Sequence, residues 1–486
     1  MLNLEIRIFL VFLVALFSSM LVLPKLARIA KVIGLLDKPS EKRKIHKIPR
    51  PLVGGIGMVI SATFCSLIFI PIAGLRGYFL GLSILLFVGF LDDFKEMGHK
   101  QKFLAQILAS LLLIYFSKVS LVSFGDLCGL GPIILPDISW LIWGVTIFCV
   151  VGVINAINLV DGLDGLAGGI SFVAFIIFAI HASIGGDETL MLLNLALAGA
   201  VLGFLRFNWY PSTMFMGDAG SLCLGFSLAF MALALTQGSN AHVSPVVPLL
   251  ILAVPITDTI TVMGKRILRG QNPFKADRYH LHHIFMRLGM GRVLAVKVIL
   301  GVTTLLSLTS LLGPLYKLSD ASLFAVFLVY FIVYVISSFF IIRLMRASLK
   351  YTKKHEETGG RAFWVHRILS SRLNFFRILR KSPRYDVELS FTCQERDRNL
   401  VFSGSVLNIS NDGFMASLPQ LDCLLDRVVA KITFPLDSEF HSLELPAEHL
   451  WFSEHGNTYY HGFRFLEFGG DQEQVVFKFL VKFKKK

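Results

Sequence analysis

The feature that most limits what this chain can fold into is a series of apolar stretches of nearly membrane-spanning length. A helix needs about 20 such residues to cross the hydrocarbon core of a bilayer. About eleven windows approach that length, at residues 5–24, 52–73, 77–91, 103–117, 138–157, 166–184, 189–205, 219–236, 246–263, 294–313 and 321–342. Composition agrees, because 54% of the 486 residues are hydrophobic and only 16% are charged. The chain is therefore predicted to be a polytopic α-helical membrane protein.

The basic residues predict how these spans are oriented. Lys and Arg are frequent in the connections 25–50, 91–102 and 264–293, whereas 184–189 and 237–245 contain neither. Positively charged loops remain on the cytoplasmic side, so the odd-numbered connections are expected to face the cytoplasm. An odd number of spans then places the C-terminus in the cytoplasm as well.

The net charge of +14 does not point to a nucleic-acid-binding protein, because the charges gather in a few stretches beside apolar segments. No nucleic-acid partner is predicted. The six Cys form no C-x-x-C pair, so neither a disulfide framework nor a zinc site is indicated.

After the last apolar window the composition changes. Residues 346–379 form a basic linker in which 361–380 carries apolar side chains near helical spacing. This pattern predicts either an interfacial helix on anionic membrane lipid or a plain basic stop-transfer segment, and it favours neither. A small cytoplasmic β-rich domain is predicted to follow, from short alternating segments at 385–392, 400–409, 427–434, 443–452 and 458–467. The predicted domains are 1–345, 346–379 and 380–486.

Acidic residues gather at four places in the membrane half, all on connections predicted to face the cytoplasm. Carboxylates at membrane boundaries are costly and usually functional, although one such pair alone is consistent with ordinary helix ends. Hard oxygen ligands beside Arg and His suit Mg²⁺ and a phosphate-bearing substrate. The residues concerned are Asp92 and Asp93, Asp161 and Asp164 after Asn158, Asp218 after Gly217, and Asp277.

Two basic segments belong to the same face. The early loop contains Arg43 and His46 among prolines and a glycine pair, which favours a shaped loop over a solvated charge run. The loop before the tenth window holds a cluster of cationic and imidazole side chains. Because Asp is abundant for a metal, these imidazoles are interpreted as donors to phosphate oxygens rather than as metal ligands. The cluster consists of Arg278, His280, His282 and His283.

Together these residues resemble the polyprenyl-phosphate N-acetylhexosamine-1-phosphate transferases, a superfamily that also contains the phospho-MurNAc-pentapeptide translocase. The resemblance covers about residues 1–345 and rests on five ordered elements. They are K-R-K-x-H-x-x-P-x-P-x-x-G-G, L-D-D, N-x-x-D-G-x-D-G-L, F-M-G-D-x-G-S and H-x-H-H. Each element alone is weak, and their order makes the set specific. The H-x-H-H arrangement is similar to the branch that starts O-antigen and exopolysaccharide chains, whereas the translocase branch usually has three consecutive His.

The resemblance implies an enzyme of the bacterial inner membrane with a cytoplasmic active site. Such an enzyme transfers an N-acetylhexosamine 1-phosphate from a UDP-sugar to undecaprenyl phosphate and releases UMP, which initiates a lipid-linked surface polysaccharide. UDP-GlcNAc is the default donor, and other UDP-hexosamines remain open. Mg²⁺ is the implied cofactor, with Mn²⁺ as an alternative. The relatives also suggest a homodimer.

The resemblance further assigns roles to individual residues. Asp218 would coordinate the metal, and Asp92 with Asp93 would deprotonate or position the lipid phosphate. Asp161 and Asp164 would join the catalytic acids, beside Asn158 in the segment that binds nucleotide and sugar. The remaining substrate contacts would come from Arg43, His46, Lys102, Arg278, His280, His282 and His283.

The C-terminal segment resembles the PilZ domain, a cyclic di-GMP receptor with a β-barrel fold. Arg380 and Arg384 match its R-x-x-x-R motif, and residues 408–413 match its [D/N]-x-S-x-x-G motif. The resemblance implies that cyclic di-GMP binds there and regulates the enzyme, with Asn408, Ser410 and Gly413 contributing from the second motif.

Two other classes compete with an enzyme. Many spans and intramembrane acids also describe a transporter, but transporters place ionisable residues near the midplane and often show inverted repeats, which this sequence lacks. A non-catalytic membrane protein that senses cyclic di-GMP would leave the Asp and His motifs without a role.

Overall fold

The computed structural model describes residues 3–37, 49–95, 97–237, 241–268, 270–271, 280–287, 290–355, 385–395, 401–410, 413–418, 427–436, 439–455, 458–466, 475–476 and 479. The chain forms two compact units, Met1–Leu369 and Ser370–Lys486. Each unit has its own core and is described separately.

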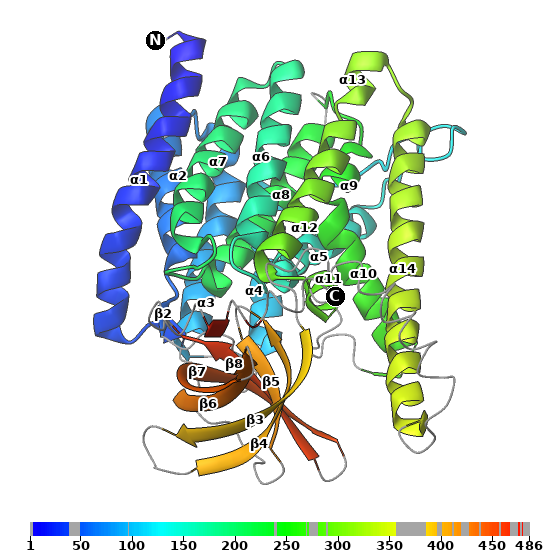
Figure 1. Ribbon diagram of the computed structural model, residues 1–486. Coiled ribbons are helices and arrows are strands. Elements are labelled where there is room, and N and C mark those ends of the chain that lie inside the picture. The colour runs from blue at the N-terminus through cyan, green and yellow to red at the C-terminus, as the bar shows by residue number, and fades with distance from the viewer. Residues whose placement is uncertain are drawn as a thin grey trace. The chain divides into compact units, whose positions relative to one another are not determined.

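The first unit consists of helices that run side by side (Figure 1). They are α1 (Leu4–Ile33), α2 (Gly54–Phe69), α3 (Arg76–Lys95), α4 (His99–Ser117), α5 (Ser139–Val160), α6 (Leu166–Ile184), α7 (Glu188–Asn208), α8 (Gly217–Thr236), α9 (Val247–Ile251), α10 (Ala253–Ile267), α11 (Leu281–Arg287), α12 (Arg292–Thr309), α13 (Leu312–Tyr316) and α14 (Asp320–His355). A short 3-10 turn, Ala73–Leu75, precedes α3.

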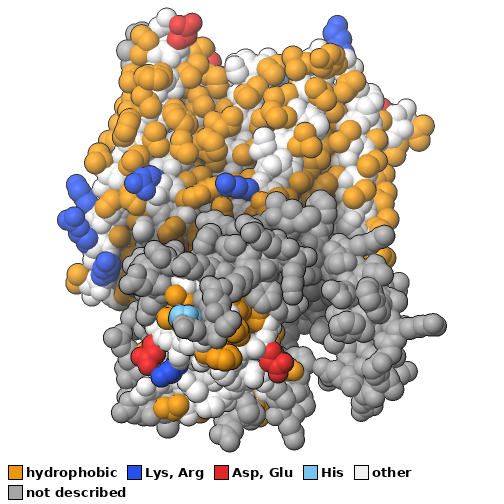
Figure 2. All heavy atoms as spheres, viewed as in Figure 1, with side chains coloured by type: hydrophobic (Ala, Val, Ile, Leu, Met, Phe, Trp, Pro, Cys, Tyr) orange, Lys and Arg blue, Asp and Glu red, His pale blue; other side chains and the backbone are white. Residues whose placement is uncertain are grey.

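Each predicted apolar window lies on these helices, which confirms the polytopic helical architecture. Among the described residues, eight segments are long and apolar enough to cross a membrane: α1, α3, α5, α6, α7, α8, α12 with α13, and the first part of α14. Helices α2, α4 and the pair α9–α10 are shorter or more polar, so the span number of about eleven stays a prediction. Hydrophobic side chains cover most of the visible outer face of the helices (Figure 2).

Helix α8 lies at the centre of this unit. Of its most apolar window, 89% is buried, compared with 22% for α1 and for α14. Two glycines let neighbouring helices reach its first turn: a Cβ added at Gly55 of α2 would lie 2.1 Å from the Cα of Gly220, and one at Gly89 of α3 would lie 2.4 Å from the Cα of Ala219. Small residues allow such backbone approach between membrane helices. The start of α8 is therefore held between α2 and α3.

The chain before α2 is hydrogen-bonded to the chain before α8. Strand β1 (Leu36–Asp37) pairs with β2 (Arg50–Pro51), and the amide N–H of Gly54 donates to the carbonyl of Phe215 at 3.0 Å. The next amide, of Gly55, donates to the carbonyl of Met216 at 2.8 Å. The glycine pair of the early loop therefore serves close packing and backbone pairing against the F-M-G-D segment.

The second unit contains a closed antiparallel barrel, which confirms the predicted β-barrel domain. Its strands are β3 (Tyr385–Glu395), β4 (Val401–Ser410), β5 (Gly413–Ser417), β6 (Arg427–Leu436), β7 (Glu439–His455) and β8 (Thr458–Phe465), in the order β3-β4-β5-β8-β7-β6. Aromatic side chains fill it, including Phe391, Phe414 and Phe463, whose ring centroids lie 4.8–5.5 Å apart. The sequence pattern predicted five of these strands and missed β5, because five residues give little alternation to detect.

Helix α14 runs past the predicted boundary at residue 345, so residues 346–355 of the predicted linker are helical. The amphipathic segment 361–380 lies outside the described residues.

Candidate active site

The carboxylate of Asp218 stands at the start of α8, where its two oxygens have different partners. Asn158 at the end of α5 donates from Nδ2 to Oδ1 at 3.0 Å, and Lys102 of α4 donates from Nζ to Oδ2 at 2.7 Å. Asn158 also donates to the hydroxyl of Ser221 at 2.8 Å, one helical turn beyond Asp218. Three separate helices therefore position this one carboxylate.

Asp92, near the end of α3, shares the same lysine. Lys102 Nζ lies 2.8 Å from Asp92 Oδ2, and the amide N–H of Met97 donates to Oδ1 at 2.6 Å. The lysine thus bridges Asp92 and Asp218 and supplies one positive charge to two carboxylates. The side chains of Lys102 and Asp218 keep 21% and 27% of their surface exposed, so the cluster is accessible to a ligand.

Asp93 has different contacts although it follows Asp92 directly. Its Oδ1 accepts the amide N–H of Asp218 at 2.8 Å, and its Oδ2 accepts that of Ala219 at 3.1 Å. A helix leaves its first amide N–H groups without partners in the helix, and a carboxylate is well suited to satisfy them because it also meets the positive end of the helix dipole. Asp93 therefore caps α8 from α3 and fixes the backbone of Asp218.

The loop after α5 brings Asp161 and Asp164 to the same side of the unit. Burial raises the pKa of Asp161 to about 7, and the charges of Asp218 and Asp164 act in the same direction. Asp164 accepts the amide N–H of Ser212 at 3.1 Å and lies 3.6 Å from the guanidinium of Arg50.

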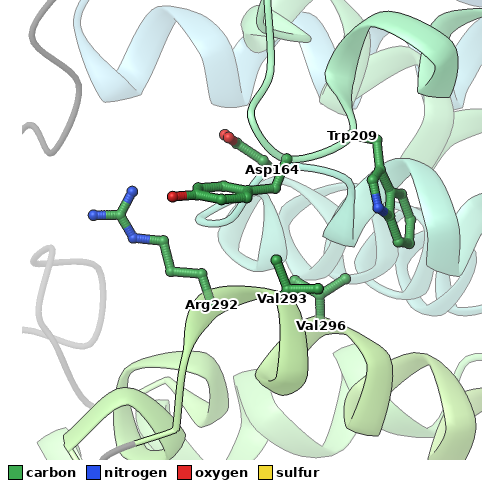
Figure 3. A pocket seen from close by; sticks show the side chains of 6 residues that line it. Asp164, Trp209, Arg292, Val293 and Val296 are labelled. Carbon is green, nitrogen blue, oxygen red and sulfur yellow. The ribbon is translucent and has the colours of Figure 1, made fainter. Parts of the chain in front are cut away.

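A small hollow lies beside Asp164. Figure 3 shows Asp164 and Arg292 on one side of it and Trp209 on the other, with two valines of α12 below. The guanidinium of Arg292 lies 5.9 Å from the ring centroid of Tyr210. The lining residues are Asp164, Trp209, Tyr210, Arg292, Val293 and Val296.

The His motif lies against the loop that carries Asp161. A Cβ added at Gly162 would lie 2.4 Å from Nε2 of His282, so the glycine makes room for this imidazole. Burial lowers the pKa of His282 to about 3, and the neighbouring His283 adds to the effect. His282 is therefore neutral near pH 7 and can serve a phosphate as an N–H donor but not as a cation. The rings of His282 and His283 lie 4.2 Å apart, centroid to centroid.

Asp258 is a site residue that the sequence reading missed. It lies in α10, is 1% exposed, and accepts from His280 Nδ1 at 2.9 Å and from the amide of Leu281 at 3.0 Å. The available signal was its position as the sole charged residue of the apolar window 246–263, where an ionisable group indicates function.

The described residues bring Asp92, Asp218, Lys102 and Asn158 into direct contact, with Asp93 behind them. Other predicted site residues lie outside the described residues: Arg43, His46, Arg278, Arg380 and Arg384.

The acidic cluster offers carboxylate donors to Mg²⁺. Among the described residues no group of three or more His, Cys, Asp or Glu side chains has the arrangement of a metal site. Mg²⁺ usually takes only one or two protein carboxylates and completes its shell with water and substrate phosphates. Asp92 and Asp218 present such a pair of carboxylates, and they already enclose a cation, the Lys102 ammonium. Their chemistry therefore fits Mg²⁺.

In the barrel, the second motif of the C-terminal domain lies where β4 turns into β5. Ser410 donates to the carbonyl of Gly413 at 3.0 Å, so its hydroxyl closes this turn. A Cβ added at Gly413 would lie 2.2 Å from the carbonyl oxygen of Phe463 in β8. The glycine of this motif therefore allows close packing of β5 against β8. Asn408 is half-buried on β4 and pairs across the sheet with Met415.

An accessible cluster of carboxylates and a lysine at the start of α8, within a bundle of apolar helices, defines a membrane protein with a polar chemical site, and the same chain carries a separate barrel domain. Comparison with known protein families gives a match for each of the two parts of the chain. A family described as glycosyl transferase family 4 matches residues 75–236, and the PilZ domain matches residues 378–482.

Curated relatives extend the first match. The chain is 32% identical over 316 residues to the "Probable undecaprenyl-phosphate N-acetylglucosaminyl 1-phosphate transferase" of Bacillus subtilis (strain 168), which covers 63% of this chain and 85% of the relative. It is 33% identical over 315 residues to the undecaprenyl-phosphate alpha-N-acetylglucosaminyl 1-phosphate transferase of Escherichia coli (strain K12), with 63% and 84% covered. The chain belongs to glycosyl transferase family 4 and carries a C-terminal PilZ domain.

Among solved structures, the inhibitor of motility of Bacillus subtilis matches at a TM-score of 0.20 and 15% identity, over 22% of this chain and 52% of that chain. That score is too low to support a fold assignment, which rests on the strands described above. The family match makes the protein a membrane-bound transferase, so the alternatives of a transporter and of a non-catalytic sensor are not supported.

Proposed function

We propose that this protein transfers GlcNAc 1-phosphate from UDP-GlcNAc to undecaprenyl phosphate and releases UMP, and that it thereby initiates a lipid-linked surface polysaccharide. The observation that carries the proposal is the joining of Asp92 and Asp218 through Lys102 at one end of the helical unit. The activities for which the relatives are named supply the lipid acceptor and the sugar.

The reaction breaks one phosphoanhydride bond and forms another. An oxygen of the lipid phosphate forms a bond to the β-phosphorus of the UDP-sugar, and the bond from that phosphorus to the oxygen of UMP breaks. Catalysis then depends on positioning and on neutralising charge. Lys102 would contact the reacting phosphates, because its ammonium already lies between the two carboxylates.

Asp218 would hold Mg²⁺, or Mn²⁺ in its place, with Asp92 beside it. When bound, the metal would neutralise charge on the diphosphate. Asp92 would position the lipid phosphate and take its remaining proton. A phosphate monoester is largely ionised near pH 7, with a second pKa of about 6, so the demand on this base is small.

Asp93 would act differently from Asp92, by holding the backbone of Asp218 in place rather than by touching substrate. This assignment rests on its two hydrogen bonds to the first turn of α8.

The nucleotide and sugar would lie toward the loop after α5 and the His motif. Asn158, Asp161 and Asp164 supply polar groups there, and the aromatic rings of Trp209 and Tyr210 lie beside Asp164. The neutral imidazole of His282, with His280 and His283, would donate to phosphate oxygens. Arg43, His46 and Arg278 would add further substrate contacts.

The domain boundaries that we propose are 1–345 for the transferase, 346–379 for a basic linker and 380–486 for the PilZ-like domain. The enzyme would lie in the bacterial inner membrane, with the active site and the C-terminal domain in the cytoplasm. It would form a homodimer, as the family resemblance implies.

The C-terminal domain would bind cyclic di-GMP and change the turnover of the transferase. Arg380 and Arg384 would pair with the phosphates and stack on the guanines, because a guanidinium suits both. Asn408 would add a polar group from β4, and Ser410 and Gly413 would shape the adjoining turn. Such regulation requires the ligand to favour one arrangement of the enzyme over another.

The activity is tested with purified full-length protein, undecaprenyl phosphate, Mg²⁺ and a panel of labelled UDP-sugars. UMP should be released with UDP-GlcNAc, and chelation of the metal should stop the reaction until Mg²⁺ or Mn²⁺ is restored. Asp218→Asn should abolish release, whereas Asp137→Asn, which changes an exposed carboxylate in the loop before α5, should not. Absence of UMP with every UDP-hexosamine would refute the proposal.

The regulatory part is tested by calorimetric titration of the full chain with cyclic di-GMP, followed by turnover with and without saturating ligand. Binding should be lost in Arg380→Ala/Arg384→Ala while basal turnover persists. An absence of heat would refute binding, and unchanged turnover at saturation would refute regulation.

A further inference from the structure

Asp258 is the junction of a hydrogen-bond network that extends beyond the His motif. Its Oδ2 accepts from His280, and its Oδ1 accepts both from the amide of Leu281 and from the hydroxyl of Tyr334 at 2.6 Å. Tyr334 belongs to α14 (Asp320–His355). All the oxygens of this carboxylate are therefore occupied by groups from the His motif and from α14.

The network fixes which nitrogen of His280 faces the site. An imidazole that uses Nδ1–H for a carboxylate presents Nε2 on its opposite edge, and the hydrogen bond of one nitrogen sets the state of the other. His280 stacks on His282 at 6.1 Å between ring centroids with planes 7° apart, and His282 lies against Gly162. The orientation of His280 therefore affects that of His282, whose ring borders the loop that carries Asp161.

Helix α14 lies at the edge of the unit, which makes an inward polar contact from it unusual. Only 22% of its apolar window is buried, and Val333 and Ile336 beside the tyrosine are 57% and 62% exposed. Tyr334 is 8% exposed and Asp258 is 1% exposed. A buried carboxylate needs its hydrogen bonds, because an unsatisfied charge away from water is costly.

One turn further along α14 a second contact holds the same two helices together. Lys265 of α10 donates to the hydroxyl of Ser338 at 2.8 Å, and its ammonium lies 4.8 Å from the ring centroid of Phe339. Both contacts join α14 to α10, the helix that carries Asp258. Among the described residues, α14 is also the helix that directly precedes the matched PilZ domain along the chain.

We propose that Tyr334 is a positioning residue of the transferase, which acts on His280 through Asp258 and makes turnover depend on the placement of α14. The inference rests on the proposed function, because it assigns the His motif to the transfer reaction. A hydroxyl–carboxylate hydrogen bond of 2.6 Å is lost when the atoms separate by about 1 Å, so a small shift of α14 releases Asp258 and His280.

The test compares Tyr334→Phe with Tyr330→Phe in the purified full-length protein. Tyr330 lies one turn earlier on the same helix, and its buried hydroxyl has no hydrogen-bond partner among the described residues, so it is a matched control. Tyr334→Phe should lower kcat about tenfold, the expected cost of one hydrogen bond to a charged group, with the KM for undecaprenyl phosphate changed less than twofold. Tyr330→Phe should remain within twofold of the wild type.

Two further measurements separate positioning from general damage. In Asp258→Asn, adding Tyr334→Phe should lower kcat no further, because the tyrosine acts through Asp258; losses that multiply would overturn the proposal. Hydrogen exchange of residues 280–287 should accelerate in Tyr334→Phe and not in Tyr330→Phe. This readout needs no turnover, so it judges the network even if the transferase assay fails. Full turnover in His280→Ala would overturn the inference and leave the transferase activity itself standing. Unchanged exchange and kcat within twofold of wild type in Tyr334→Phe would refute the inference.

Discussion

Replacing Asp93 tests the claim that two adjacent aspartates have different tasks. In Asp93→Ala the amide N–H groups of Asp218 and Ala219 lose their acceptors. In the wild type these acceptors are the carboxylate oxygens of Asp93, at 2.8 and 3.1 Å. Loss of a helix cap costs about 1–2 kcal/mol. We assume that the same free energy separates the catalytically competent position of Asp218 from a displaced one. Turnover then falls about 5–30-fold, since 1.36 kcal/mol corresponds to a tenfold change in rate.

The chain offers a matched control for the loss of a cap. Asp187 caps α7 by accepting the amide of Leu190 at 2.9 Å, and it lies in a connection without basic residues, away from the acidic cluster. Asp187→Ala should lower the thermal unfolding midpoint about as much as Asp93→Ala does, but it should leave kcat within twofold. UMP release and thermal unfolding are measured on the same detergent-solubilised preparations.

The asparagine variant separates capping from acid–base chemistry. Asn retains one of the two acceptor oxygens and is a good cap, so Asp93→Asn should keep at least about a tenth of wild-type turnover. A general base would instead lose about 10²–10⁴-fold when its carboxylate is replaced. Inactivity of Asp93→Asn, or equal losses of kcat in Asp93→Ala and Asp187→Ala, would refute the positioning argument.

Three further predictions address neighbouring parts of the site. Asp92→Asn should lower turnover without rescue at high pH if Asp92 acts mainly by charge, and clear rescue in a pH–rate profile would indicate a general base instead. Gly55→Ala should cost about 1–3 kcal/mol of stability and most of the activity, because its Cβ would lie 2.1 Å from the Cα of Gly220; Gly144→Ala, which has no atom within 4 Å of its Cβ, should be neutral in the same thermal assay. The raised pKa of Asp161, about 7 instead of 3.8, means that the unfolded chain loses this proton first, so ionisation destabilises the fold as pH rises from about 4 to about 7. Asp161→Asn should therefore show a smaller fall in unfolding midpoint between pH 5 and pH 8 than the wild type, and equal falls would contradict the assignment.

Much of the architecture was predictable from the sequence because the bilayer imposes a simple rule on it. Long apolar stretches must become helices when no water is available to satisfy the backbone, so each apolar window corresponds to helix in the structure. Alternating segments likewise predicted five of the six barrel strands. The ordered motifs identified the acidic residues that lie together at one end of the unit, because the residue types and spacing of a short motif indicate its chemistry.

The contacts of those acids were decided only by the tertiary structure. Asp92 and Asp93 are neighbours in sequence, but successive helical side chains point in directions about 100° apart. One therefore meets Lys102, and the other meets the first turn of α8. No local sequence pattern predicts which helices pack on either side of α3.

Asp258 illustrates the same limit. Sequence placed it in an apolar window, and its role follows only from three groups that approach it from α10's neighbours, His280, Leu281 and Tyr334. These residues lie 22, 23 and 76 positions away along the chain. The sequence by itself determined that this protein is a bundle of membrane helices with clustered acids, followed along the chain by a small barrel domain. Helix packing decided which acid faces the substrates and which ones hold the others in place, because that depends on distances between segments that no local pattern encodes.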